Sequence, residues 1–111
     1  MYDYSNAPIR FIRVMSGSMK GETLTLRPDE AVYLGRERAC KLMFSMDYAN
    51  VSRMHCSVKF DSATKMFVVM DLSSNGTYVN GIQKLEKEVN TPVVIGSTLE
   101  LGDNSCTVLL G

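Results

Sequence analysis

Apolar and polar residues alternate along several short segments of the chain. Cys56, Val58 and Phe60 alternate with Ser57 and Lys59, which predicts a strand with one buried face. The continuous apolar run at residues 66–70 predicts a strand covered on both faces. Further strands are predicted over residues 9–15, 22–26, 31–34, 99–101 and 106–110. Since no segment of ten or more residues has a clean helical period, the pattern indicates an all-β sandwich or barrel.

Polar turn signals separate these predicted strands. Ser16-Gly17 and Lys20-Gly21 lie between the first two, which we expect to pair as a hairpin. Residues 61–64 join the strand at 56–60 to the strand at 66–70, and residues 102–104 form a turn before the last strand. Short connections of this kind fit antiparallel pairing.

The segment DLSSNGTYVNG, residues 71–81, places two Asn-Gly pairs around one short strand. Asn-Gly tolerates positive φ, so we expect tight reversals at residues 75–76 and 80–81. The first turn also carries polar side chains that a reversal does not need, namely Ser73, Ser74, Asn75 and Thr77. It is therefore a candidate binding loop, whereas we expect the second to be only a turn.

Length, charge and cysteine content limit the possible classes of protein. A chain of 111 residues, 45% of them hydrophobic, can form one domain, expected over residues 9–111 after a flexible tail at 1–8. Because 12 basic and 12 acidic side chains balance, no nucleic acid partner is expected. No apolar run is long enough for a signal peptide or a membrane span. Three cysteines without C-x-x-C spacing favour a reduced, intracellular setting, expected to be cytoplasmic.

Three separated motifs agree in order and spacing with a known family. They are Gly35-Arg36, then Ser52-Arg53-Met54-His55, then Ser74-Asn75-Gly76-Thr77 followed by Val79-Asn80-Gly81. From residue 9 to residue 110 the chain resembles the forkhead-associated (FHA) domain family. The resemblance implies an eleven-stranded β-sandwich of two twisted, mostly antiparallel sheets. It also implies a module that binds phosphothreonine peptides through loops at one end and is linked to Ser/Thr kinase signalling.

The chemistry of a phosphothreonine receptor matches these residues. Phosphothreonine carries about −1.5 to −2 charges and three acceptor oxygens, so its receptor needs a cation and several oriented donors. Arg36 offers a planar fork for two phosphate oxygens, and Ser52 offers a short hydroxyl donor. The Asn75 amide can hold the main chain of an extended peptide. Arg53 and Ser74 stand where family members place residues that reach the ligand.

The resemblance assigns supporting roles to other residues of the motifs. His55 is expected to brace the binding loop through hydrogen bonds. The remaining support residues are Gly35, Gly76, Thr77, Asn80 and Gly81. Outside the motifs, Lys41 and Arg38 either add positive charge near the site or are solvated, and Tyr48 either touches the peptide or packs into the protein.

Each interpretation has a simpler rival. Arg36 and Arg53 can be solvated surface arginines, and Ser52 can merely cap a local turn. Ser52, His55 and Asp71 contain the residue types of a hydrolase triad, but three such types are expected by chance in a chain of this length. We expect neither catalysis nor a cofactor. The alternative function is a scaffold domain that binds its partner independently of phosphorylation.

The sequence also gives little support for a metal site. Its candidate ligands would be His55 and the three cysteines, Cys40, Cys56 and Cys106, but their spacings match no zinc module. The cysteines lie in apolar strand patterns, so we expect them to be small buried residues.

Overall fold

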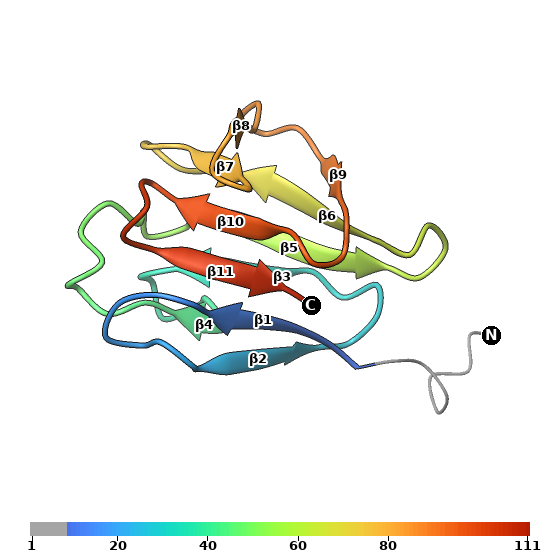
Figure 1. Ribbon diagram of the computed structural model, residues 1–111, viewed down its shortest axis with the longest axis horizontal. Coiled ribbons are helices and arrows are strands. Elements are labelled where there is room, and N and C mark those ends of the chain that lie inside the picture. Colours follow the sequence, from blue (N-terminus) through green and yellow to red (C-terminus); the bar gives the residue numbers. More distant parts are fainter. Residues whose placement is uncertain (1–8) are drawn as a thin grey trace.

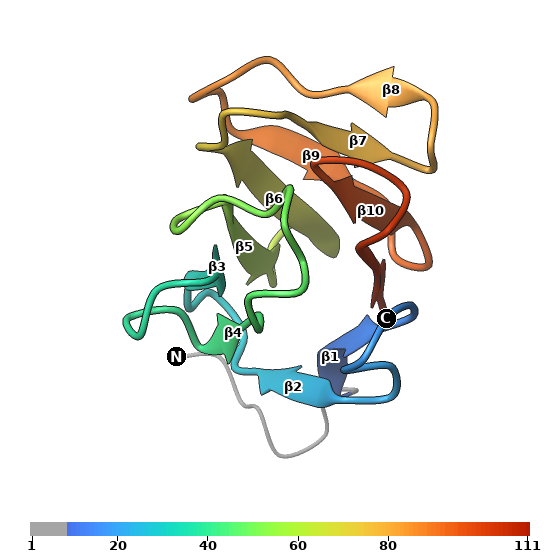
Figure 2. The same cartoon turned by 90° about the vertical axis from the view of Figure 1, so that its left-hand side faces the viewer.

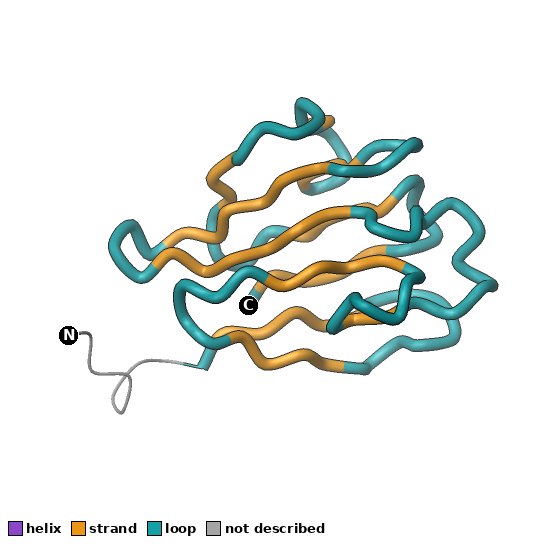
Figure 3. The backbone as a smooth tube through the Cα atoms, turned by 180° about the vertical axis from the view of Figure 1, so that it is seen from behind, coloured by secondary structure: helices purple, strands orange, loops and turns teal. Residues whose placement is uncertain are grey.

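The computed structural model describes residues 9–111, and these residues form eleven strands and no helix (Figures 1 and 3). The predicted tail at 1–8 lies outside the described residues. The strands are β1 (Arg10–Val14), β2 (Thr23–Leu26), β3 (Val32–Gly35), β4 (Leu42–Met43), β5 (Cys56–Asp61), β6 (Met66–Asp71), β7 (Thr77–Val79), β8 (Gln83–Lys84), β9 (Thr91–Val93), β10 (Thr98–Leu101) and β11 (Thr107–Leu110).

The strands form two twisted sheets packed face to face (Figure 2). One sheet has the order β2-β1-β11-β10-β7-β8, and the other has the order β4-β3-β5-β6-β9. Among the strand pairs of the described residues only β3–β4 is parallel. The predicted all-β sandwich of eleven mostly antiparallel strands is therefore confirmed.

Side-chain alternation places one face of each sheet in the core. In β5, Cys56, Val58 and Phe60 are buried, as the period of two predicts. The inner faces of the two sheets meet in a continuous apolar core, which includes the fully buried Leu34 and Leu99. Burying this surface supplies the main driving force for folding and gives the loops a rigid base.

The predicted first hairpin is confirmed, because β1 and β2 pair antiparallel. The prediction for β6 is wrong in one respect. Phe67 and Val69 point into the core, but Met66, Val68 and Met70 on the other face stay half-exposed, because no layer covers the outer face of this sheet. An uninterrupted run of apolar residues cannot distinguish these two cases, since Val and Met also occur on half-exposed strands.

Strands β8 and β9 carry no strand signal in the sequence. Both residues of β8, Gln83 and Lys84, are exposed, so they carry no apolar signal. Strand β9 contains Pro92, which is exposed on an edge strand, the position in a sheet where proline is tolerated. Edge strands like these escape pattern reading because they bury few side chains.

Loops from both sheets converge at one end of the sandwich, on the left in Figure 1 and facing the viewer in Figure 2. Backbone hydrogen bonds tie them together: the Arg36 amide donates to Ser52 O at 3.2 Å, and the Gly102 amide donates to Gly76 O at 2.9 Å. Arg36, the Ser52–His55 motif and Ser74-Asn75-Gly76 lie in these loops, whereas Asn80 and Gly81 form the turn between β7 and β8. No helix in the described part of the chain is long and apolar enough to cross a membrane.

Candidate functional site

Gly35 and Arg36 lie where β3 runs into the loop end. A Cβ atom on Gly35 would come within 2.1 Å of the carbonyl oxygen of Arg53, so only glycine allows this close approach of two chain segments. The half-buried Arg36 donates from Nε to the carbonyl oxygen of Val51 at 2.5 Å. This bond fixes the guanidinium and leaves its two terminal amino groups without a hydrogen-bond partner among the described residues.

His55 connects the Ser52 loop to the loop that follows β6. Its Nδ1 accepts a hydrogen bond from the Ser52 amide at 3.0 Å, so the ring proton lies on Nε2, which donates to the Gly76 carbonyl at 2.9 Å. The side chain is fully buried. Burial lowers the pKa of His55 below its ordinary value, which keeps the imidazole neutral and able to accept at Nδ1.

Asp71 holds the shape of the following loop from the end of β6. Its Oδ1 accepts hydrogen bonds from the Ser73 amide at 3.1 Å, the Ser73 hydroxyl at 2.6 Å and the Thr77 hydroxyl at 2.8 Å. The Ser73 Oγ in turn accepts from the Gly76 amide at 2.7 Å. All four residues are buried, so the loop is fixed from inside by satisfied polar groups.

The outer side of this loop presents Ser74 and Asn75. The Ser74 amide donates to the Ser52 hydroxyl oxygen at 3.0 Å, and the Asn75 Nδ2 donates to the Asn50 carbonyl at 3.2 Å. Both residues are exposed. Arg36, Ser52, Ser74 and Asn75, which are predicted to contact a ligand, therefore lie along one connected line of hydrogen-bonded segments.

The model of the FHA domain family matches residues 32–102, more than half of the chain. The chain belongs to the FHA domain family. The match covers all three motifs that suggested the resemblance.

Solved structures of FHA domains have the same fold. The FHA domain of a hypothetical protein from Arabidopsis thaliana is 27% identical, with a TM-score of 0.77 over 94% of this chain and 85% of that one. The FHA domain of CT664 protein from Chlamydia trachomatis is 20% identical, with a TM-score of 0.77 over 93% and 96%. The MEK1 FHA domain in complex with the HOP1 pThr318 peptide is 25% identical, with a TM-score of 0.71 over 91% and 93%. No curated protein sequence matches the chain.

Arg53 in this FHA domain forms hydrogen bonds only through its main chain among the described residues. Its carbonyl oxygen accepts from the Glu37 amide at 3.1 Å and from the Cys40 thiol at 3.3 Å. The side chain is exposed and forms no hydrogen bond or ion pair with a described residue. Arg53 follows Ser52 in the sequence, and its exposed guanidinium is available to a ligand.

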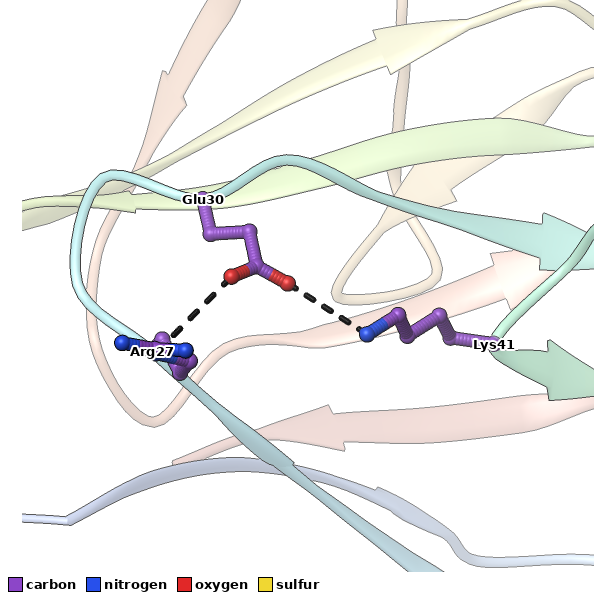
Figure 4. Close-up of polar contacts among 3 residues, drawn as sticks. All are labelled: Arg27, Glu30 and Lys41. Atoms are coloured by element: carbon purple, nitrogen blue, oxygen red, sulfur yellow. Dashed lines mark hydrogen bonds and ion pairs between the residues drawn. The ribbon is translucent and has the colours of Figure 1, made fainter.

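Lys41 is directed to another part of the FHA domain. Its Nζ lies 3.4 Å from Glu30, which also pairs with Arg27 at 3.9 Å in the turn between β2 and β3 (Figure 4). Glu30 precedes β3, whereas Arg36 follows it, so the Lys41 charge is drawn away from the site. Arg38 is exposed.

Tyr48 packs into the protein, the second of the two alternatives for this residue. It is 2% exposed and donates its hydroxyl proton to the Ser16 carbonyl at 2.7 Å. The ring thereby anchors the loop between β4 and β5 on the β1–β2 connection. This loop supplies Asn50 and Val51, whose carbonyl oxygens hold Asn75 and Arg36.

The sequence analysis did not identify Asp103 or Lys84 beside the site. Asn50 also donates from Nδ2 to the Asp103 carboxylate, which connects the β4–β5 and β10–β11 loops. The Lys84 side chain passes over Gly76, since a Cβ there would lie 3.1 Å from Lys84 Cε. None of these residues belongs to a recognised motif, and only the folded arrangement brings them to the site.

The geometry argues against a hydrolase triad at Ser52, His55 and Asp71. Both ring nitrogens of His55 are engaged by main-chain groups, so neither is available to accept the Ser52 hydroxyl proton. Asp71 Oδ1 accepts from Ser73 and Thr77, and no hydrogen bond joins Asp71 to the ring among the described residues. The buried His55 has the bracing contacts that the resemblance implies.

The three cysteines are free and buried, as predicted. Burial raises the pKa of each thiol, that of Cys106 to about 12, so none is a ready thiolate ligand. Within residues 9–111, no three His, Cys, Asp or Glu side chains group closely enough to hold a metal ion.

Proposed function

We propose that this FHA domain binds threonine-phosphorylated peptides and recruits the proteins that carry them in Ser/Thr kinase signalling. The observation that carries the proposal is the Arg36 guanidinium, which is fixed through Nε while its terminal donors remain free beside Ser52. A fixed fork of donors matches a phosphate, because little entropy is lost when it binds. The MEK1 FHA domain, 25% identical, has been solved with a phosphothreonine peptide, which supports the same ligand class.

Ser52 is arranged to donate to the phosphate. Its Oγ accepts the Ser74 amide proton, so the hydroxyl proton itself remains free for an outside acceptor. Its amide is already used by His55, which positions the residue without occupying the hydroxyl. We assign Arg36 and Ser52 to the phosphate, with the exposed Arg53 as a second cation and Ser74 beside it.

Asn75 is assigned to the peptide main chain. One Nδ2 proton is used on the Asn50 carbonyl, and the remaining Nδ2 proton and Oδ1 can pair with a backbone carbonyl and amide of the ligand. Such a pair fixes the register of an extended peptide next to the phosphorylated residue. His55, Gly35, Gly76, Thr77, Asn80 and Gly81 are assigned to support of the site.

The domain acts by recruitment and not by catalysis in this proposal, and we place it inside the cell, where protein kinases act. A small interface on a flexible peptide corresponds to micromolar affinity, or about −8 kcal/mol. A recess that accepts the threonine methyl group would disfavour phosphoserine by about 1 kcal/mol. Neither nucleic acid nor membrane is a partner in the proposal.

Replacing Arg36 tests the proposal directly. We expect Arg36→Ala to abolish detectable binding of a phosphothreonine peptide library in fluorescence anisotropy, while its thermal unfolding stays cooperative. Arg27→Ala is the matched control, because Arg27 is an exposed arginine in the β2–β3 turn. It removes the same charge and should bind like the wild type.

Two results would overturn the assignment. Undiminished binding by Arg36→Ala would remove this residue from the site. Equal binding of phosphorylated and phosphatase-treated partners would favour the alternative function, a phosphorylation-independent scaffold.

A further inference from the structure

An open depression of about 340 Å³ lies beside the proposed site, between the β7–β8 turn and the β10–β11 loop. It is lined by Tyr78, Gly81, Glu100, Gly102, Asp103 and Asn104. Two of these residues are glycines, so part of the wall has no side chain. The volume is sufficient for one extended side chain of a ligand.

The lining has a negative and aromatic character. It contains two carboxylates, those of Glu100 and Asp103, and no lysine or arginine. The Glu100 carboxylate forms no hydrogen bond or ion pair with any described residue. Lys84, which pairs with Tyr78 on the opposite side from Glu100, does not line the depression. Tyr78 is the cross-strand partner of Glu100 on the same face of the sheet, which places an aromatic ring next to that carboxylate.

Asp103 is fixed as an anion at the edge of the depression. Its Oδ1 accepts from the Ser105 hydroxyl at 2.5 Å and from the Ser105 amide at 2.9 Å. These donors, with a further one from Asn50, hold the pKa of Asp103 below its usual range. The carboxylate is therefore ionised at neutral pH, and these hydrogen bonds orient it at the edge of the depression.

The depression is joined directly to the peptide-holding side of the site. Gly102 donates its amide proton to the Gly76 carbonyl at 2.9 Å, and Asn50 bonds to Asp103 through its side chain and to Asn75 through its carbonyl. Arg36 contacts the same loop one residue further on, at Val51. The order along the surface is thus phosphate side, Asn75, then depression, and an extended peptide advances about 3.3 Å per residue along such a path.

We infer that this depression selects phosphothreonine peptides with a lysine or arginine flanking the phosphorylated residue. The inference rests on the proposed function and adds the class of peptide. A basic side chain would place its cation between Glu100 and Asp103 and its stem or charge against the Tyr78 ring. A ligand with a phosphate and a nearby cation matches the Arg36 side and the acidic side of the same surface.

The test compares peptides that differ only in one flanking residue. Lysine, alanine or glutamate is placed at each position around the phosphothreonine in turn, and Kd is measured by fluorescence anisotropy at low and high salt. We expect lysine at one flanking position to bind about fivefold more tightly than alanine there and glutamate to bind more weakly. The preference should shrink as salt rises.

Glu100→Gln should remove most of the lysine preference without weakening the alanine peptide. Glu30→Gln is the matched control, since it removes the same charge in the β2–β3 turn. Wild-type binding with no preference for lysine at any position would overturn the inference and leave the proposed function intact, as would an unchanged preference in Glu100→Gln. If the wild type bound no peptide in a phosphate-dependent way, both the proposed function and the inference would be overturned.

Discussion

The two Asn-Gly pairs of this FHA domain adopt different backbone structures. At Asn80-Gly81 both residues have positive φ, 53° and 71°, and the chain reverses between the paired strands β7 and β8. At Asn75-Gly76 only the glycine does, with φ of 96°, and the chain passes from one sheet to the other. The predicted tight reversal is confirmed at the second pair, and the first pair lies in a bend that joins the two sheets.

The difference lies in the side chains around each pair. The second turn is a hairpin whose geometry follows from Asn and Gly alone, and Asn80 Oδ1 also accepts a hydrogen bond from the Thr98 amide at 2.9 Å. The first loop is fixed by buried groups distant in sequence, mainly Asp71 and His55. The same dipeptide therefore forms a local turn in one place and a loop held by tertiary contacts in the other. In that loop Asn75 uses one Nδ2 proton on the Asn50 carbonyl, and its Oδ1 forms no hydrogen bond with a described residue.

Removing His55 should give the largest effect on this contrast. We expect His55→Ala to lower the free energy of unfolding by about 3 kcal/mol, because it opens a cavity and leaves the Ser52 amide and the Gly76 carbonyl without partners. Chemical denaturation measures the loss, and phosphopeptide affinity should fall with it. His55→Asn, which keeps an amide acceptor, should lose less. A His55→Ala variant as stable as the wild type would mean that the first loop is fixed without this tertiary contact.

Alanine at each asparagine should separate binding from stability. We expect Asn75→Ala to weaken phosphopeptide binding by about tenfold or more and to change stability by less than about 0.5 kcal/mol, because its side chain is exposed. Asn80→Ala should do the reverse. It loses the Thr98 bond and places alanine at φ of 53°, which together cost about 1 to 2 kcal/mol.

Calorimetry measures the phosphopeptide affinity of the two variants, and urea denaturation measures their free energy of unfolding. If both asparagines affected binding equally, the second turn would have to be counted as part of the site. If Asn75→Ala were the less stable protein, the assignment of support and contact would be reversed.

The strands that could be predicted are those in which apolar, buried residues alternate with polar ones. Strands β5, β10 and β11 alternate cleanly, and the structure places their apolar residues in the core. The exposed edge strand β8 has no such signal. The outer face of β6 was predicted to be covered because Val68 and Met70 are apolar, but coverage depends on other elements of the fold and is not written in the strand itself.

The candidate site follows the same division. Arg36, Ser52 and Asn75 could be found because they belong to motifs with fixed spacing. Asp103 could not, because it lies far from Asn50 in the sequence and the two residues meet only when the β4–β5 and β10–β11 loops converge. The acidic depression is likewise a product of register, since β7 and β10 pair Tyr78 with Glu100.

Acid should lower the free energy of unfolding through the first loop and not through the second turn, and this effect should be the smallest of the three. His55 is the only histidine of the chain, and burial lowers its pKa below the ordinary 6.5. Below pH 6.5 the unfolded chain takes up a proton that the folded protein does not bind, so stability falls as pH falls, until pH reaches the folded-state pKa. The slope is at most about 1.4 kcal/mol per pH unit.

Urea denaturation across this pH range should show the decline in stability in the wild type and a flatter profile in His55→Asn. Equal slopes in the two proteins would assign the acid sensitivity to carboxylates, and the neutral imidazole would then not be what holds Ser52 and Gly76 together.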